Sequence, residues 1–173
     1  MRRRAVVGTI AAAIAFCLAV PRDRVRRIFA RLRSQPGPTP HELRTMVAVA
    51  EHIYPRDSSP GAVDLGIEQF LGRHLGTDYY RRCLPPLRRA TAALDAWAVE
   101  AGARDFVSSP HGQRCALVDR LASAQDSGLA GDFADLVDLT LEGCFSDPVH
   151  GGNRLGQGWA IMREGVREEW FGA

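Results

Sequence analysis

Residues 140–159 read TLEGCFSDPVHGGNRLGQGW, and this stretch decides how the second half of the chain folds. It cannot continue a helix, because Pro148 has no N–H to donate and the adjacent Gly151 and Gly152 readily adopt positive φ angles. Asn153, which follows them, also tolerates the left-handed region. We therefore predict a helix that ends in a specific, tightly turned loop.

Three charged side chains lie in this loop, and they suggest two different roles. Glu142, Asp147 and Arg154 are candidates for an acid–base set, but we favour a structural role in which Arg154 holds the loop by a two-pronged bond to one carboxylate. Arg154→Ala is then expected to lower stability or assembly. Phe145 and Trp159 are expected to bury their rings beneath the loop, with the indole N–H bonded to a carbonyl. The predicted structural or partner-binding motif comprises Glu142, Phe145, Ser146, Asp147, Pro148, Gly151, Gly152, Asn153, Arg154 and Trp159.

Apolar residues recur at helical spacing through the rest of the body, and we find no segment with the alternation of a strand. We expect helices over residues 40–54, 62–75, 77–101 with a break or kink at Pro85-Pro86, 110–124, 133–144 and from 159 onward. The first of these has a strong start signal, since Thr39, Pro40 and Glu42 form a capping box with proline at the first position. The predicted fold class is all-α, a compact bundle of about six helices.

The N-terminal head differs from the body in composition. Nine arginines fall in residues 1–33, and the apolar run 5–20 is short for a membrane span but long enough for a signal core or signal anchor. Residues 3–7 loosely match a twin-arginine signal. Residues 22–33 suggest a basic amphipathic helix for an anionic membrane surface, with a solvated linker as the alternative. We divide the chain into a signal or anchor segment (1–33), a linker (34–38) and a helical domain (39–173).

Composition and motifs exclude several classes of function. The chain has 173 residues and a net charge of +2, which gives no reason to expect a nucleic-acid partner. No pair of histidines has H-x-x-x-H spacing and no C-x-x-C pair occurs, so we expect no metal site. Cys83, Cys115 and Cys144 are expected to be small buried thiols, although a disulfide is possible if the body is exported. We find no complete catalytic set and no cofactor-binding motif.

The loop also carries a family resemblance. Residues 142–148, residues 151–154 and the pair Gly158-Trp159 resemble the signature of the gluconate 2-dehydrogenase subunit 3 family. Residues 50–55, residues 59–62 with their Pro-Gly-Ala turn, and Phe70-Leu71 resemble the family's first helix and the turn after it. The resemblance spans roughly residues 39–160. Cys144, His150 and Leu155 stand where the family usually has a bulky apolar residue, tyrosine and aspartate.

The resemblance implies a non-catalytic accessory subunit of a membrane-associated dehydrogenase acting on gluconate, sugars or alcohols. It implies FAD in a large partner subunit, haem c in a possible cytochrome c subunit, and no cofactor in this chain. It also implies a role in maturation, stability or export of the flavoprotein, on the periplasmic side, by the twin-arginine route or with residues 5–20 as a membrane anchor. The arginine distribution alone favours the cytoplasmic face.

Two other readings remain open at this stage. One is a stand-alone, membrane-anchored helical interaction protein without an enzyme partner. The other is an enzyme in its own right that uses Glu142 or Asp147 together with His150.

Overall fold

The computed structural model describes residues 37–124 and 128–171, and side chains in the last helix as far as Glu164. The chain separates into one unit over Met1–Gln35 and a second over Pro36–Ala173. The predicted signal or anchor segment, including its basic amphipathic stretch, therefore lies outside the described residues. None of the described helices is both long enough and apolar enough to cross a membrane.

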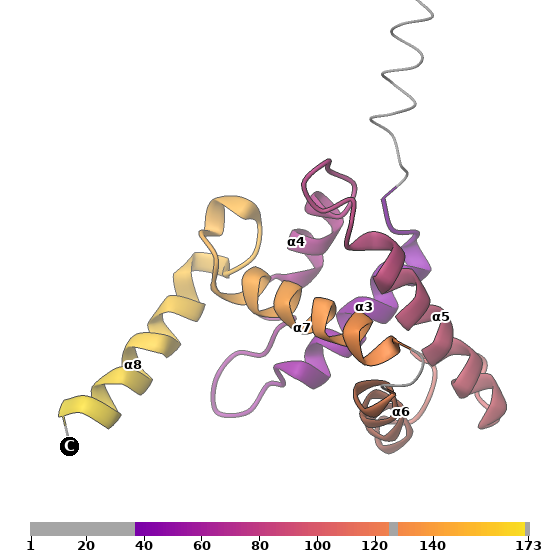
Figure 1. Ribbon diagram of the computed structural model, residues 1–173. Coiled ribbons are helices and arrows are strands. Elements are labelled where there is room, and N and C mark those ends of the chain that lie inside the picture. The colour runs from indigo at the N-terminus through magenta and orange to yellow at the C-terminus, as the bar shows by residue number, and fades with distance from the viewer. Residues whose placement is uncertain (1–36, 125–127, 172–173) are drawn as a thin grey trace, which may run out of the picture. The chain divides into compact units, whose positions relative to one another are not determined.

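The described residues form six α-helices and no strand, which confirms the predicted all-α class. In chain order they are α3 (Pro40–Ile53), α4 (Ile67–His74), α5 (Leu84–Glu100), α6 (His111–Ser123), α7 (Leu129–Phe145) and α8 (Gln157–Phe171), with the 3₁₀ turns η2 (Pro148–His150) and η3 (Arg154–Gly156) between the last two. Helix α7 packs against α3, α4, α5 and α6. After the turn that follows α7, helix α8 leads away from the other five (Figure 1).

The start of α3 follows the predicted capping chemistry, and the starts of α4, α5 and α7 differ from the prediction. Thr39 forms the expected capping box with Glu42 at the start of α3. Helix α4 begins only at Ile67 because Gly66 has a φ of 90°, which breaks the predicted helix over residues 62–75.

The predicted helix does not start at residue 77, because residues 78–83 form turns and α5 starts at Leu84, so Pro85 and Pro86 neither break nor kink a helix. They occupy the first turn of α5, where a missing N–H leaves no hydrogen bond unmade. Helix α7 begins at Leu129, four residues before the predicted start.

One apolar core joins α3 to α7. The side chains that are almost completely buried and largest in volume include Met46, Phe70, Leu87, Leu94, Phe106, Leu121 and Leu136. Burying a side chain of this size contributes about 1.5–3 kcal/mol. Helix α7 packs against four other helices of this core. The loop that follows α7 therefore starts from a fixed point.

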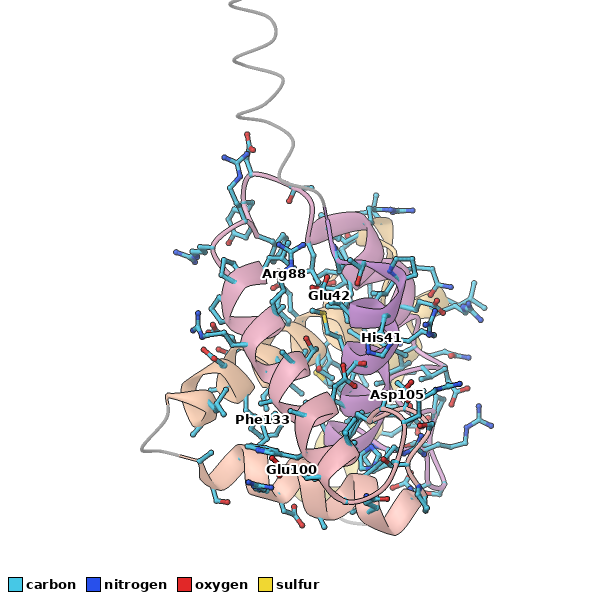
Figure 2. The ribbon with its side chains drawn as sticks, turned by 90° about the vertical axis from the view of Figure 1, so that its right-hand side faces the viewer. His41, Glu42, Arg88, Glu100, Asp105 and Phe133 are labelled. Carbon is cyan, nitrogen blue, oxygen red and sulfur yellow. The ribbon has the colours of Figure 1, made fainter. Side chains whose placement is uncertain are left out.

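Polar contacts fix how the helices are set against one another. Arg88 on α5 lies beside Glu42 on α3, with its Nε 3.0 Å from the carboxylate (Figure 2). Arg89 donates two hydrogen bonds to the carboxylate of Asp132, which is almost fully buried, at 3.0 and 2.6 Å. This two-pronged pair joins α5 to the first turn of α7.

Candidate functional site

The turn between α7 and α8, residues 146–158, is called here the Asn153 turn. Helix α7 ends as predicted, with the Ser146 amide bonded to the Glu142 carbonyl at 2.8 Å. Asp147 accepts a hydrogen bond from the Val149 amide at 2.9 Å and so starts the η2 turn at Pro148. The predicted Asp-Pro turn and glycine reversal are both present, since Gly151 has a φ of 96°.

Two glycines let the backbone of the turn lie directly against α7, and a third lets α7 lie close to α4. A Cβ atom at Gly152 would stand 1.9 Å from the Gly143 carbonyl oxygen, and one at Gly158 would stand 2.2 Å from the Cys144 carbonyl oxygen. At Gly143 itself a Cβ would stand 2.5 Å from Ile67 Cδ1. Atoms do not approach so closely, so Gly152 and Gly158 require glycine for space rather than for a φ angle, whereas at Gly143 the neighbouring side chains would have to shift.

Asn153 is the residue that holds the turn together. It is completely buried and has a φ of 45°, in the left-handed region that Asn tolerates better than most residues. Its side-chain amide donates to the Ser146 carbonyl at 2.7 Å, and its side-chain oxygen accepts from the Gly158 amide at 2.8 Å. Its own amide donates to the Gly143 carbonyl at 2.9 Å. One side chain thus joins the start of the turn to its end.

The predicted role of Arg154 as the clamp of the loop is wrong. Its side chain is exposed, and among the described residues it forms no ion pair with Glu142 or Asp147. Its backbone amide, rather than its guanidinium, ties the turn down by donating to the Leu65 carbonyl at 2.9 Å. The side chain instead borders a shallow hollow of about 450 Å³ together with Arg56, Asp57 and other residues of the loop before α4.

The aromatic residues confirm one part of the prediction and correct another. Trp159 Nε1 donates to the Phe145 carbonyl at 2.7 Å, as expected for an indole N–H. The indole is not buried beneath the loop, however, because Trp159 is 38% exposed. Phe145 is half-buried and meets the ring of Tyr54 edge-on, with ring centroids 5.4 Å apart.

The candidate acid–base residues of the loop do not converge. Glu142 accepts a hydrogen bond from the Tyr80 hydroxyl, and burial together with this carboxylate raises the pKa of Tyr80. Asp147 is engaged with the Val149 amide, and the His150 carbonyl accepts from His74 Nε2 at 2.8 Å. The His150 backbone amide donates to the Asp147 carbonyl at 3.0 Å, but within the described residues no side-chain hydrogen bond or ion pair joins Glu142, Asp147 and His150 to one another.

Large apolar side chains point outward from the turn. Val149 on η2 is 70% exposed and Leu155 on η3 is 88% exposed, and Trp159 and Met162 on the first turns of α8 are also exposed. The elements that carry them contact one another. We call these four residues the turn surface. Leu155 has a φ of 56°, which is unfavourable for a leucine.

Sequence reasoning did not anticipate a second group of chemically active side chains. His52 on α3 and His111 and Cys115 on α6 each offer a ligand atom, and these atoms lie within 4.8 Å of one another. We call them the His–Cys cluster. The spacing H-x-x-x-C from His111 to Cys115 is the one signal in the sequence that points to it. Cys83, Cys115 and Cys144 are all free thiols, and only Cys144 is fully buried.

Comparison with known proteins identifies one family, whose model covers both the Asn153 turn and the His–Cys cluster. No curated protein and no solved structure matches the chain. The family model for gluconate 2-dehydrogenase subunit 3 matches residues 40–163, which is more than half of the chain and includes the Asn153 turn and the His–Cys cluster. The chain therefore belongs to the gluconate 2-dehydrogenase subunit 3 family.

Proposed function

We propose that this chain is the small, non-catalytic subunit of a membrane-associated, FAD-dependent dehydrogenase that oxidises gluconate or a related sugar, sugar acid or alcohol. Membership of a family named as a subunit of gluconate 2-dehydrogenase supports assembly with the other subunits of such an enzyme. In this proposal the large partner subunit holds FAD and oxidises the substrate, and a cytochrome c subunit with haem c accepts the electrons.

The observation that carries the proposal is the turn surface. Leu155 combines a strained backbone angle with 88% exposure, and neither property contributes to the stability of the isolated chain. The turn beneath it is nevertheless held by buried hydrogen bonds of Asn153 at 2.7 and 2.8 Å. A rigid turn that presents apolar side chains outward is typical of a protein-binding surface, because rigidity limits the entropy lost on association.

The same proposal covers the cellular location of the chain and its role toward the flavoprotein. The small subunit supports maturation, stability or export of the flavoprotein on the periplasmic side of the membrane. Residues 5–20 act as the anchor or as part of a twin-arginine signal. These assignments rest on the sequence of residues 1–33 and on the family resemblance.

Co-purification from native membranes tests the proposal. The tagged full chain is expected to bring down a large flavin-containing protein, and Leu155→Asp is expected to reduce the flavin recovered by about tenfold, the effect of losing one important interface residue. Aspartate tolerates the left-handed region, so this variant retains the turn. The matched control is Val99→Asp, which changes a valine that is 59% exposed on α5.

Two results would overturn the proposal. One is recovery of the wild-type chain as a folded monomer without flavin, which would favour a stand-alone interaction protein. The other is an equal loss of flavin in Leu155→Asp and Val99→Asp, which would mean that the turn surface is not the interface.

A further inference from the structure

The His–Cys cluster lies where α3 and α6 pack against each other, and it is independent of the Asn153 turn. His52 is in the last turn of α3. His111 and Cys115 are four residues apart near the start of α6, and this spacing places both side chains on one face of the helix. That face meets His52, so that the rings of His52 and His111 stack with centroids 5.4 Å apart and an interplanar angle of 29°.

The hydrogen bonding of His52 leaves one ring nitrogen ready to bind a cation. Its Nδ1 lies 2.8 Å from the Ala48 carbonyl oxygen. Because a carbonyl oxygen only accepts, Nδ1 carries the hydrogen and Nε2 carries the lone pair. Nε2 is shielded from solvent and has no hydrogen-bond partner among the described residues. A backbone carbonyl that fixes the tautomer in this way is the usual partner of a metal-binding histidine.

The ligand atoms lie at separations that suit a tetrahedral metal ion. Cys115 Sγ is 3.6 Å from His111 Nε2. In a tetrahedral zinc site, with Zn–S of about 2.3 Å and Zn–N of about 2.0 Å, sulfur and nitrogen stand about 3.5 Å apart. The three ligand atoms all fall within 4.8 Å of one another, so small side-chain rotations bring the third atom to the same distance.

A solvent-accessible hollow lies beside the cluster, and a metal ion held by the three side chains would have its fourth coordination position facing it. His52 and His111 line a hollow of about 450 Å³, whose wall also includes Glu51, Arg44 and Arg114. The Glu51 carboxylate is already engaged by the backbone amides of Arg56 and Val63, at 3.3 and 3.0 Å. Water or a small anionic ligand in the hollow is therefore better placed than Glu51 to complete the coordination, and the two arginines favour an anion there.

We propose that His52 Nε2, His111 Nε2 and Cys115 Sγ bind a single Zn²⁺ ion, with the fourth position open to the hollow. Two imidazoles and a thiolate suit a borderline-soft divalent ion of this class rather than Mg²⁺ or Ca²⁺, which prefer oxygen ligands. Binding forms one Zn–S and two Zn–N bonds, and the proton of the Cys115 thiol is released to solvent. The ion joins α3 to α6 and stabilises their contact.

Metal titration of the purified full chain tests the site. Zn²⁺ is added in competition with a chromophoric chelator, and one ion per chain is expected to bind. His52→Ala, His111→Ala and Cys115→Ala are each expected to weaken binding by at least about tenfold, since the loss of even an outer-shell partner costs that much. The matched controls are His150→Ala and Cys83→Ala, which remove the same chemical groups elsewhere and are expected to bind as the wild type does.

Two further measurements separate a metal site from a packing contact. Co²⁺ bound to the wild type and to Cys83→Ala is expected to show thiolate-to-metal charge-transfer absorption, and Cys115→Ala is expected to lack it. His111 is exposed, so His111→Ala is expected to fold normally. Zn²⁺ is therefore expected to raise the melting temperature of the wild type but not that of His111→Ala. Zn²⁺ affinity that is the same in the wild type, His111→Ala and Cys115→Ala would overturn the proposal.

Discussion

The Asn153 turn is held by close backbone packing and by the hydrogen bonds of one buried side chain, Asn153, whereas the His–Cys cluster consists of side chains alone. The turn lies so close to α7 that a Cβ at Gly152 would stand 1.9 Å from a carbonyl oxygen. The cluster is formed by side chains from α3 and α6, one of which, His111, is exposed. Gly152, Gly158 and Asn153 in the turn are therefore expected to tolerate almost no substitution, whereas substitutions in the cluster are expected to cost mainly ligand binding.

The largest expected effect is that of Gly152→Ala. The new methyl group meets backbone, which cannot rotate away as a side chain does, so the turn must move off α7. We expect the free energy of unfolding to fall by more than about 3 kcal/mol, at the upper end of the range for overpacked sites. Urea unfolding of the full chain measures it.

Gly131→Ala is the matched control, because Gly131 lies in α7 with nothing within 4 Å of a Cβ. It is expected to leave stability unchanged or to raise it by about 0.5–1 kcal/mol. Equal stability of Gly152→Ala and Gly131→Ala would break the comparison, since the turn would then not depend on backbone contact.

Asn153→Ala is expected to cause the next largest loss in the free energy of unfolding. The substitution leaves the buried Gly158 amide without its acceptor and places alanine in the left-handed region, which together cost about 2–3 kcal/mol. Arg154→Ala is expected to change the free energy of unfolding by less than about 0.5 kcal/mol, because its side chain is exposed. A reversed order in urea unfolding would restore Arg154 as the clamp.

A further effect, confined to alkaline pH, concerns the thiol of Cys144, which lies in the last turn of α7 next to the Asn153 turn. Burial, and to a lesser degree Glu51, raises the pKa of Cys144 from an ordinary value of 9.0 to about 12. Between these values the unfolded chain loses the proton and the folded chain keeps it, so stability is full below pH 9 and falls as the pH rises towards 12. The slope contributed by this thiol approaches about 1.4 kcal/mol per pH unit.

Cys144→Ala is expected to remove that part of the alkaline slope, which urea unfolding at several pH values measures. Tyr80, whose pKa is also raised, contributes in the same direction in both proteins and cancels in the difference. In the folded protein a thiol reagent is expected to modify Cys83 and Cys115, which are half-buried, and to spare Cys144. Rapid modification of Cys144 would show that the end of α7 opens more readily than its packing implies.

Much of the fold could be predicted because its signals are local. The capping box at Thr39, the helical stripe before Cys144 and the glycines after Asp147 each act within a few residues. The errors came where two local signals compete. Pro85 and Pro86 break a helix in its interior but favour its first turn, and only the surrounding structure decides which of these applies.

The site was predicted in outline but not in its mechanism. The stretch from Glu142 to Trp159 was identified as the distinctive feature, and its turn geometry was confirmed. The role of clamp was given to Arg154 because a charged side chain is the most conspicuous candidate for such a bond. The structure gives that role to Asn153, whose small amide fits a fully buried position that a guanidinium would not.

By itself, the sequence determined the helical class, the position of the turn after Phe145 and the family resemblance, because these depend on residue types within a short span. Only the tertiary structure decided which side chain holds the turn, which apolar residues remain exposed on it, and that His52 meets His111 and Cys115. The physical reason is distance along the chain. His52 and His111 lie on different helices, and no local pattern records how two helices pack.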